Sequence, residues 1–145
     1  MKDAGIVFYF EENDKDVWSG RSIDLDAWNY NCKVAGMNKA IIINKTNQHL
    51  TSFDSDMDIQ IVSEMPELTG HNTQVVCPCD GTPSSSLWDF DHNTDWYVFG
   101  PANGWVEGDF FADSFISIPQ NGIGYHHGVF VAATVMFDRH NKINI

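Results

Sequence analysis

The chain has 145 residues, of which 43% are hydrophobic and 13% are aromatic. This length and composition exclude a disordered protein and predict one folded domain over residues 1–145, with a single core. The net charge of −12, from 8 basic and 20 acidic residues, argues against loose electrostatic binding to nucleic acid. Such binding needs Lys and Arg to neutralise phosphates.

The sequence predicts a soluble cytoplasmic protein without a membrane partner. No apolar run reaches the roughly eighteen residues that a membrane span needs, and no basic-then-apolar leader is present at the N-terminus. The cysteines, Cys32, Cys77 and Cys79, are too few for a disulfide framework and indicate a reducing compartment. Cys77 and Cys79 stand too close together for a zinc knuckle, so we expect no metal site.

The first part of the chain has the pattern of a βαβ unit. Gly5–Phe10 is continuously apolar, which is typical of a strand in a sheet that is covered on both faces. Asp24–Ala35 predicts a helix, with Asp24 as the N-cap and Gly36 as the first residue beyond the C-terminus. Lys39–Ile43 predicts the second strand immediately afterwards.

The remaining strands bring the expected total to about six, and the last apolar run is ambiguous. The further strand predictions are Asp58–Val62, Gln74–Cys77, Asp95–Phe99 and Ser114–Ile118. Ser84–Ser86 and Asp89–Thr94 are expected to be loops. In Val129–Phe137 the β-branched residues favour a strand, whereas the length and the pair Ala132-Ala133 permit a buried helix.

Several predicted strands end at a proline or a glycine. The ends are Cys77-Pro78, Phe99-Gly100-Pro101 and Ile118-Pro119. Such breaks place bare backbone N–H and C=O groups at the carboxyl end of a strand, which is where open α/β sheets bind ligands. The sequence therefore predicts one site at this edge.

The dipeptide His126-His127 is the clearest candidate for acid–base chemistry outside these strand ends. Adjacent residues on a helix point in different directions, so the pair is a poor bidentate metal site. One imidazole could exchange protons in a pocket, because its free pKa lies near neutrality. Alternatively, both histidines are polar residues at a helix start.

Three segments together resemble the C-terminal signature of the SpoU/TrmH branch of the SPOUT methyltransferases. They are Tyr97–Pro101, Ala112–Pro119 and Tyr125–Asp138. The family pattern contains Phe-Gly-Pro-Glu, then a strand that ends Ile-Pro-Met, then a loop that runs into a helix ending Tyr-Glu. Ile6–Tyr9 and Asp24–Gly36 are similar to the first strand and first helix of the family.

The resemblance implies an α/β fold with a mainly parallel sheet, helices on both faces and a C-terminal trefoil knot. It makes Val129–Phe137 a helix. The family binds S-adenosylmethionine in the knot, largely through main-chain groups of three loops. The positions of this chain that the resemblance assigns to the cofactor are Cys77, Pro78, Phe99, Gly100, Pro101, Gly104, Ile118, Pro119, Gln120, His127 and Gly128.

The chain departs from the family at the side chains that act on RNA. The arginine that helps to activate the ribose hydroxyl falls at Tyr30, and its partner asparagine falls at Asp24. The glutamate after Gly-Pro is Ala102, and the serine and asparagine of the last loop are Tyr125 and His127. The catalytic groups that the resemblance would supply have therefore changed.

Deprotonation of a ribose 2′-hydroxyl needs a base or a cation nearby. Arg21, just before the first helix, and His127 are the candidate catalytic residues on this ground. The resemblance implies a methyltransferase for tRNA or rRNA, of the ribose 2′-O type, that works as a homodimer built on the first and last helices. The alternatives are a module that binds an adenosyl ligand or a protein without methyl transfer, and another enzyme that uses the same pocket.

Overall fold

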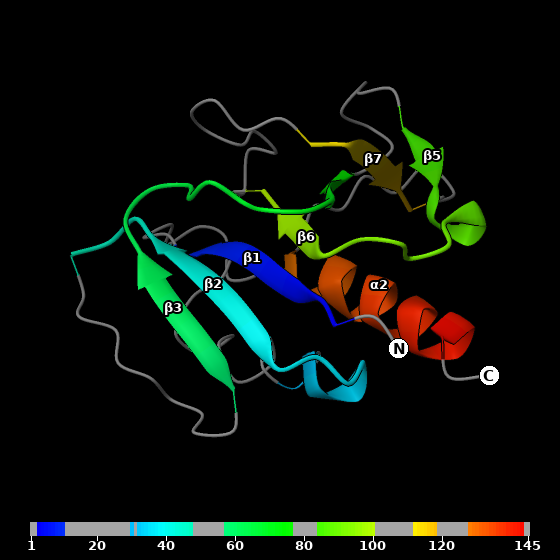
Figure 1. The fold of residues 1–145 in the computed structure, drawn as a ribbon, viewed down its shortest axis with the longest axis horizontal. Helices are drawn as coiled ribbons and strands as arrows, with labels where there is room; N and C mark the ends of the chain where they lie inside the picture. The colour runs from blue at the N-terminus through cyan, green and yellow to red at the C-terminus, as the bar shows by residue number, and fades with distance from the viewer. Residues whose placement is uncertain are drawn as a thin grey trace.

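The protein forms a seven-stranded sheet packed against helices (Figure 1). The computed structural model describes residues 3–10, 30, 32–47, 57–76, 84–100, 112–118 and 128–143. The strands are β1 (Gly5–Phe10), β2 (Lys39–Asn44), β3 (Asp58–Val62), β4 (Asn72–Val76), β5 (Ser85–Ser86), β6 (Trp96–Phe99) and β7 (Ser114–Ser117). The described helices include the 3-10 turn η3 (Leu87–Asp89) and the long helix α2 (Gly128–Ile143).

The strand order is β3-β2-β1-β6-β4-β7-β5, and each pair of neighbouring strands is parallel. The predicted α/β class with a mainly parallel sheet is therefore confirmed. The prediction of a loop over Ser84–Ser86 was wrong, because Ser85 and Ser86 pair with Ile116 and Ser117 of β7. Two serines carry no strand pattern of their own, so this edge strand exists only through its pairing with β7.

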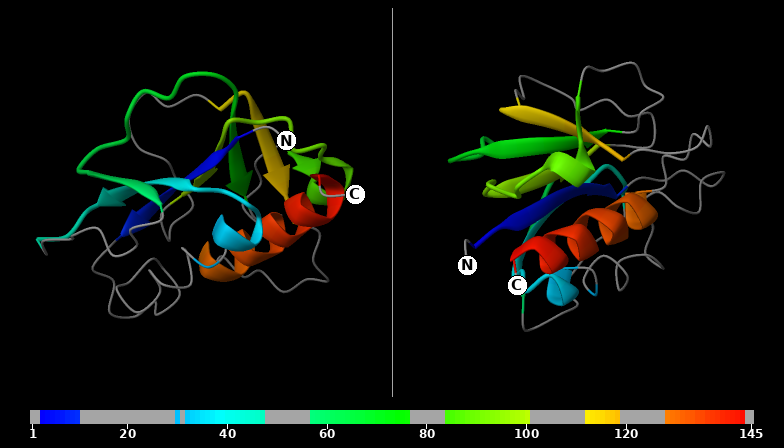
Figure 2. Two further views of the ribbon diagram at one scale, coloured as in Figure 1. Left: turned by 60° about the horizontal axis from the view of Figure 1, so that its bottom comes forward. Right: turned by 90° about the vertical axis from the view of Figure 1, so that its right-hand side faces the viewer.

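The ambiguous apolar run is helical, as the resemblance implies. It lies within α2, which runs across one face of the sheet in the direction opposite to the strands (Figure 2). Ala132, Val135 and Met136 are buried against the sheet, and Phe137 is exposed. A helix tolerates the β-branched residues here because burial of this face outweighs their weak helix propensity. No helix in the described residues has the length and hydrophobicity that crossing a bilayer requires.

The alternation of β1 divides the core into two layers. Ile6, Phe8 and Phe10 face the helices and share a cluster with residues of α2. Val7 and Tyr9 face the opposite side, where Met65 and Leu68 from the loop after β3 cover them. This two-sided burial explains why β1 is apolar at every position.

The first helix ends at the glycine that the sequence indicates. Tyr30 and residues 32–34 are helical, and the rest of the predicted helix lies outside the described residues. Gly36 has φ of 72°, and its N–H donates to the Lys33 carbonyl at 3.0 Å. The Met37 N–H donates to the Cys32 carbonyl at 2.9 Å. This pair of bonds is a Schellman motif, which turns the chain directly into β2.

We expect Gly36→Ala to lower the free energy of unfolding by about 1 kcal/mol, because a Cβ is strained at this left-handed backbone position. Gly36→Asn is the matched control, since asparagine adopts this conformation more readily. Urea denaturation of the two variants measures the difference. Equal stability of the alanine variant and the wild type would contradict the assigned role of Gly36.

Candidate functional site

Three adjacent strands end together at one edge of the sheet. β4 lies between β6 and β7, and Val75 pairs with Phe99 on one side and with Ile116 on the other. Val76, the last residue of β4, pairs with Ser117, the last residue of β7. In open α/β sheets, ligands bind outside the carboxyl ends of such strands. The predicted convergence of strand ends is therefore present in the fold.

The described residues at this edge place few side chains in the path of a ligand. The side chains of Phe99 and Ile118 are buried, and Phe99 is part of the layer that faces α2. Gly100 is half-buried and follows β6 directly. Gly128, the first residue of α2, lies on the same side of the molecule, because α2 runs against the strand direction (Figure 2). A ligand at this edge would therefore meet backbone groups.

The other predicted site residues lie outside the described residues, so the structure does not place them. For the cofactor these are Cys77, Pro78, Pro101, Gly104, Pro119, Gln120 and His127, and for catalysis Arg21 and His127. His126 also lies there. Within the described part of the chain, no group of three or more His, Cys, Asp or Glu residues could hold a metal ion.

A network of polar groups ties the amino ends of the same three strands together. The Thr73 hydroxyl of β4 lies 3.2 Å from the Thr94 hydroxyl, just before β6, and 3.0 Å from the Ser114 hydroxyl of β7. The Asn72 N–H donates to the Asp113 carboxylate at 2.7 Å, and the Asp113 N–H donates to the Asn72 carbonyl at 3.0 Å. These bonds set the register that aligns the opposite, carboxyl ends.

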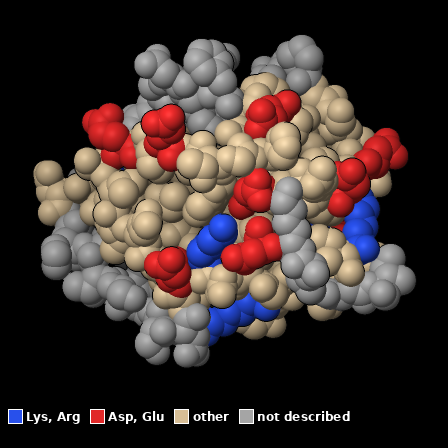
Figure 3. All heavy atoms as spheres, viewed as in Figure 1, with Lys and Arg blue, Asp and Glu red and all other residues tan. Residues whose placement is uncertain are grey.

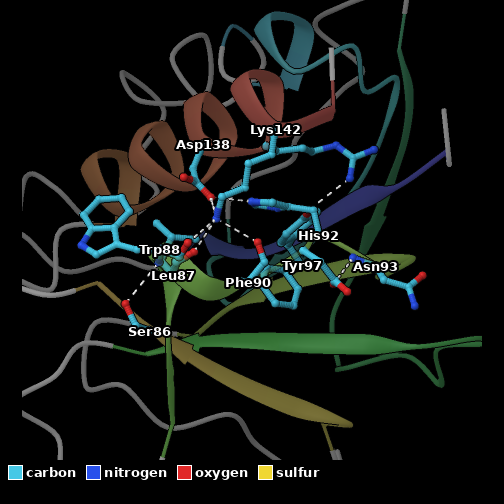
Figure 4. Close-up of polar contacts among 11 residues, drawn as sticks. Ser86, Leu87, Trp88, Phe90, His92, Asn93, Tyr97, Asp138 and Lys142 are labelled. Atoms are coloured by element: carbon cyan, nitrogen blue, oxygen red, sulfur yellow. Dashed lines mark hydrogen bonds and ion pairs between the residues drawn. The ribbon is translucent and has the colours of Figure 1, made fainter. Parts of the chain in front are cut away.

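A second polar cluster, which we call the His92 cluster, joins α2 to β6 (Figure 4). It comprises His92, Tyr97, Asp138, Arg139 and Lys142. His92 Nδ1 lies 2.6 Å from the Tyr97 hydroxyl, and His92 Nε2 lies 2.7 Å from Asp138 Oδ2. Arg139 Nη1 donates to the Tyr97 hydroxyl at 3.1 Å. The side chains of His92, Tyr97 and Arg139 are buried.

Lys142 connects the cluster to the segment that contains η3. Its Nζ lies 2.8 Å from Asp138 Oδ2 and donates to the carbonyls of Leu87, Trp88 and Phe90 at 2.8, 3.0 and 2.8 Å. The last two turns of α2 are therefore held by charge-assisted bonds as well as by apolar packing.

One neutral tautomer of His92 satisfies all of these hydrogen bonds. An ionised Asp138 carboxylate only accepts, so His92 Nε2 carries the proton that it donates. Neutral Nδ1 then accepts from the Tyr97 O–H, whose oxygen in turn accepts from Arg139. Burial lowers the pKa of His92 below its usual value, and the Asp138 carboxylate opposes this shift. Burial also raises the pKa of Tyr97 to about 12, so the phenol stays protonated.

Sequence reasoning did not find the His92 cluster. His92 lies in a segment whose polar composition predicts a loop, and it is 46 residues from Asp138 along the chain. Its one local signal is backbone conformation, since its φ is 63°. That conformation cannot be read from a histidine, so no pattern in the sequence indicates the cluster.

The comparisons with known proteins bear on the fold. No family model matches the chain, and no curated protein matches its sequence. Among solved structures, the chain is similar to a TrmH/SpoU tRNA modifying enzyme from A. aeolicus, with a TM-score of 0.67 and 13% identity over 99% of this chain and 77% of that one.

Two further solved structures have the same fold. One, described as giving structural insights into the 2-OH methylation of C/U34 on tRNA, has a TM-score of 0.67 and 12% identity over 100% of this chain and 93% of that one. The other is the SpoU methyltransferase AviRb from Streptomyces viridochromogenes in complex with AdoMet, with a TM-score of 0.64 and 12% identity over 98% of this chain and 61% of that one. The chain therefore has the fold of the TrmH/SpoU methyltransferases.

We expect Tyr97→Phe to lower the free energy of unfolding by about 1–3 kcal/mol, because it leaves His92 Nδ1 without a donor in a buried site. Tyr30→Phe is the matched control, since Tyr30 is 64% exposed. Urea denaturation of both variants measures the effect. A Tyr97 variant as stable as the Tyr30 variant would show that the hydroxyl contributes nothing to the cluster.

Proposed function

We propose that this protein is a methyltransferase that uses S-adenosylmethionine to methylate RNA, either tRNA or rRNA, at ribose 2′-hydroxyls. The observation that carries the proposal is the common edge at which β6, β4 and β7 end, in a fold shared with TrmH/SpoU enzymes, one of which was solved with AdoMet. The chain is proposed to act in the cytoplasm.

We propose that the described residues at this edge accept an adenosyl ligand. Phe99 and Ile118 bury their side chains in the core, so their N–H and C=O groups are what they offer at the edge. Gly100 adds no side chain where the backbone leaves β6, which allows close approach of a ligand. When bound, the cofactor supplies an electrophilic methyl group. We propose that residues of the loops after β4, β6 and β7 complete its site.

Methyl transfer to a ribose requires that the hydroxyl lose its proton. We propose His127, directly before α2, as the base that takes this proton, because an imidazole near its free pKa accepts protons at neutral pH. We propose that Arg21 stabilises the negative charge that develops on the ribose oxygen. These two residues take the place of the family arginine whose position is Tyr30.

The connection from β6 to β7 must pass β4, since β4 lies between them in the sheet. A crossing of this kind is compatible with a knotted C-terminus, and the similar fold supports it. We propose that residues 101–111 and 119–127 form the trefoil knot, a rare exception to the rule that chains do not thread loops.

The distribution of charge favours one alternative, a module that binds an adenosyl ligand or a protein partner without methyl transfer. Much of the described basic charge is committed within the fold: Arg139 is buried, Lys142 binds Asp138, and the Lys39 ammonium lies 4.6 Å from the ring centre of Trp96. Acidic side chains outnumber basic ones on the face shown in Figure 3. RNA binding without basic residues at the surface is weak.

We expect S-adenosylmethionine to bind the wild type in calorimetric titration and Gly100→Val to weaken binding about tenfold or more, because a branched side chain obstructs the backbone approach. The matched control is Thr69→Val, an exposed position at the amino edge, before β4. An unchanged dissociation constant in the Gly100 variant, or no binding by the wild type, would contradict the site. A labelled-methyl assay on bulk tRNA then separates the methyltransferase from the module without transfer.

We also propose a homodimer built on the first helix and α2. Phe137 on α2 and Tyr30 on the first helix are 52% and 64% exposed, and both helices lie on the same face of the sheet (Figure 2). Exposed aromatic residues are common at the centres of interfaces. A second copy of the chain is the proposed cover.

Sedimentation at micromolar concentration should give twice the mass of the 16.4 kDa chain. We expect Phe137→Glu to shift the protein to the monomer, because it buries a charge in the proposed interface. Trp88→Glu, at a position of similar exposure on η3, is the control and should leave the mass unchanged. A wild type that sediments as a monomer would refute the dimer.

A further inference from the structure

The two ends of α2 lie in different surroundings, and the His92 cluster contacts only its C-terminal part. Its polar contacts hold the C-terminal part of the helix at the amino edge of the sheet, through Asp138 and Lys142. The same helix begins at Gly128, on the side where β4, β6 and β7 end. Because a helix moves as a rigid unit over this length, loosening its far end changes the position of its start.

The charges around His92 come from each element packed against it. α2 contributes the Asp138 carboxylate at 2.7 Å and the cations of Arg139 and Lys142, and β6 contributes the Tyr97 hydroxyl at 2.6 Å. The Phe90 ring contacts the imidazole edge to face, with ring centres 4.9 Å apart. Asp91, the residue before His92, is a second carboxylate near the cluster and acts on Tyr97.

Protonation of His92 disturbs the cluster in two ways. It places a positive charge near the cations of Arg139 and Lys142, and both cations lower the pKa of His92. It also puts a proton on Nδ1, which no longer accepts from the Tyr97 O–H, and the phenol must turn its hydrogen into a buried space. Both changes weaken the contact between α2 and β6.

We propose that His92 is a proton-sensitive positioning residue: when it is protonated, α2 loosens from β6 and the affinity for S-adenosylmethionine falls. The proposal rests on the proposed function, since it assigns a pH response to that same site. We call the contacts of the His92 cluster between α2 and β6 the clamp. The neutral form of His92 is favoured in the folded protein, so the clamp is complete above the ordinary histidine pKa of 6.5. It is lost as the pH falls from there through the lower pKa of the folded state.

Calorimetric titration with S-adenosylmethionine from about pH 7.5 to about pH 5 tests the proposal, a window that lies above the carboxylate pKa values. We expect an affinity loss of about tenfold, because the binding-competent fraction falls, with a midpoint below 6.5. His92→Asn keeps a residue that tolerates the left-handed backbone and cannot be protonated. Its affinity should not change over this range, and a loss that persists in it would overturn the proposal.

Two charge variants should shift the pH midpoint of the affinity loss, and a purely structural role of these residues predicts no such shift. Asp138→Asn removes the anion that favours the imidazolium, so the midpoint should fall to lower pH. Lys142→Met removes a cation that opposes it, so the midpoint should rise. His140→Asn, at an exposed position of the same helix, is the control and should leave the midpoint unchanged. Shifts in the same direction in both charge variants would contradict the proposal.

Hydrogen exchange of the α2 amides in the ligand-free protein separates failure of this proposal from failure of the proposed function. No binding at any pH would overturn the proposed function and the affinity effect. The clamp itself would then stand if the α2 amides lose protection from exchange as the pH falls, with a midpoint below 6.5, and keep that protection in His92→Asn. Binding that does not depend on pH, with unchanged protection of α2, would overturn the clamp alone.

Discussion

The parallel pairing of β4 with both β6 and β7 is the constraint on which the rest of the structure depends. It forces the chain that leaves β6 to pass β4 before it enters β7. It also brings three strand ends to one edge. The hydroxyls of Thr73, Thr94 and Ser114 hold the opposite ends of these strands together, and hydrogen bonds to buried hydroxyls are costly to leave unmade. Alignment at the amino edge therefore determines alignment at the edge that we propose as the site.

The position of α2 follows from a combination of apolar and polar contacts. Ala132, Val135 and Met136 supply the burial that favours docking on the sheet, but burial alone permits a helix to slide or rotate. The bonds of Asp138 and Lys142 to His92 and to the η3 carbonyls are directional and specify one position. Hydrogen bonds in a buried network of this kind depend on one another, which is why the protonation state of one imidazole matters.

Much of the fold could be predicted because its strands carry strong local patterns. Gly5–Phe10 and Asp58–Val62 agree with the structure at both ends, and Gly36 ends the first helix as its residue type indicates. The periodicity of α2 did not distinguish helix from strand, and the resemblance to a known family was needed. β5 could not be predicted, because its two serines form a strand only through contact with β7.

The candidate site, too, could be predicted in part from the sequence. Its location at the strand ends could be predicted, since Gly and Pro residues that follow apolar runs mark them locally. The polar contacts that position it join residues far apart in sequence, such as Thr73 and Ser114, 41 residues apart, and His92 and Asp138, 46 apart. Only the folded chain brings these side chains together.

The function proposed for this protein depends on binding of S-adenosylmethionine at the common edge of β6, β4 and β7. Titration of isotope-labelled protein with S-adenosylhomocysteine, followed by NMR of the backbone amides, tests it most directly. We expect the largest shifts at Phe99, Gly100 and Ile118, with amides at the amino edge, such as Thr73, unaffected. Shifts centred on the amino edge, or none at saturating ligand, would contradict it.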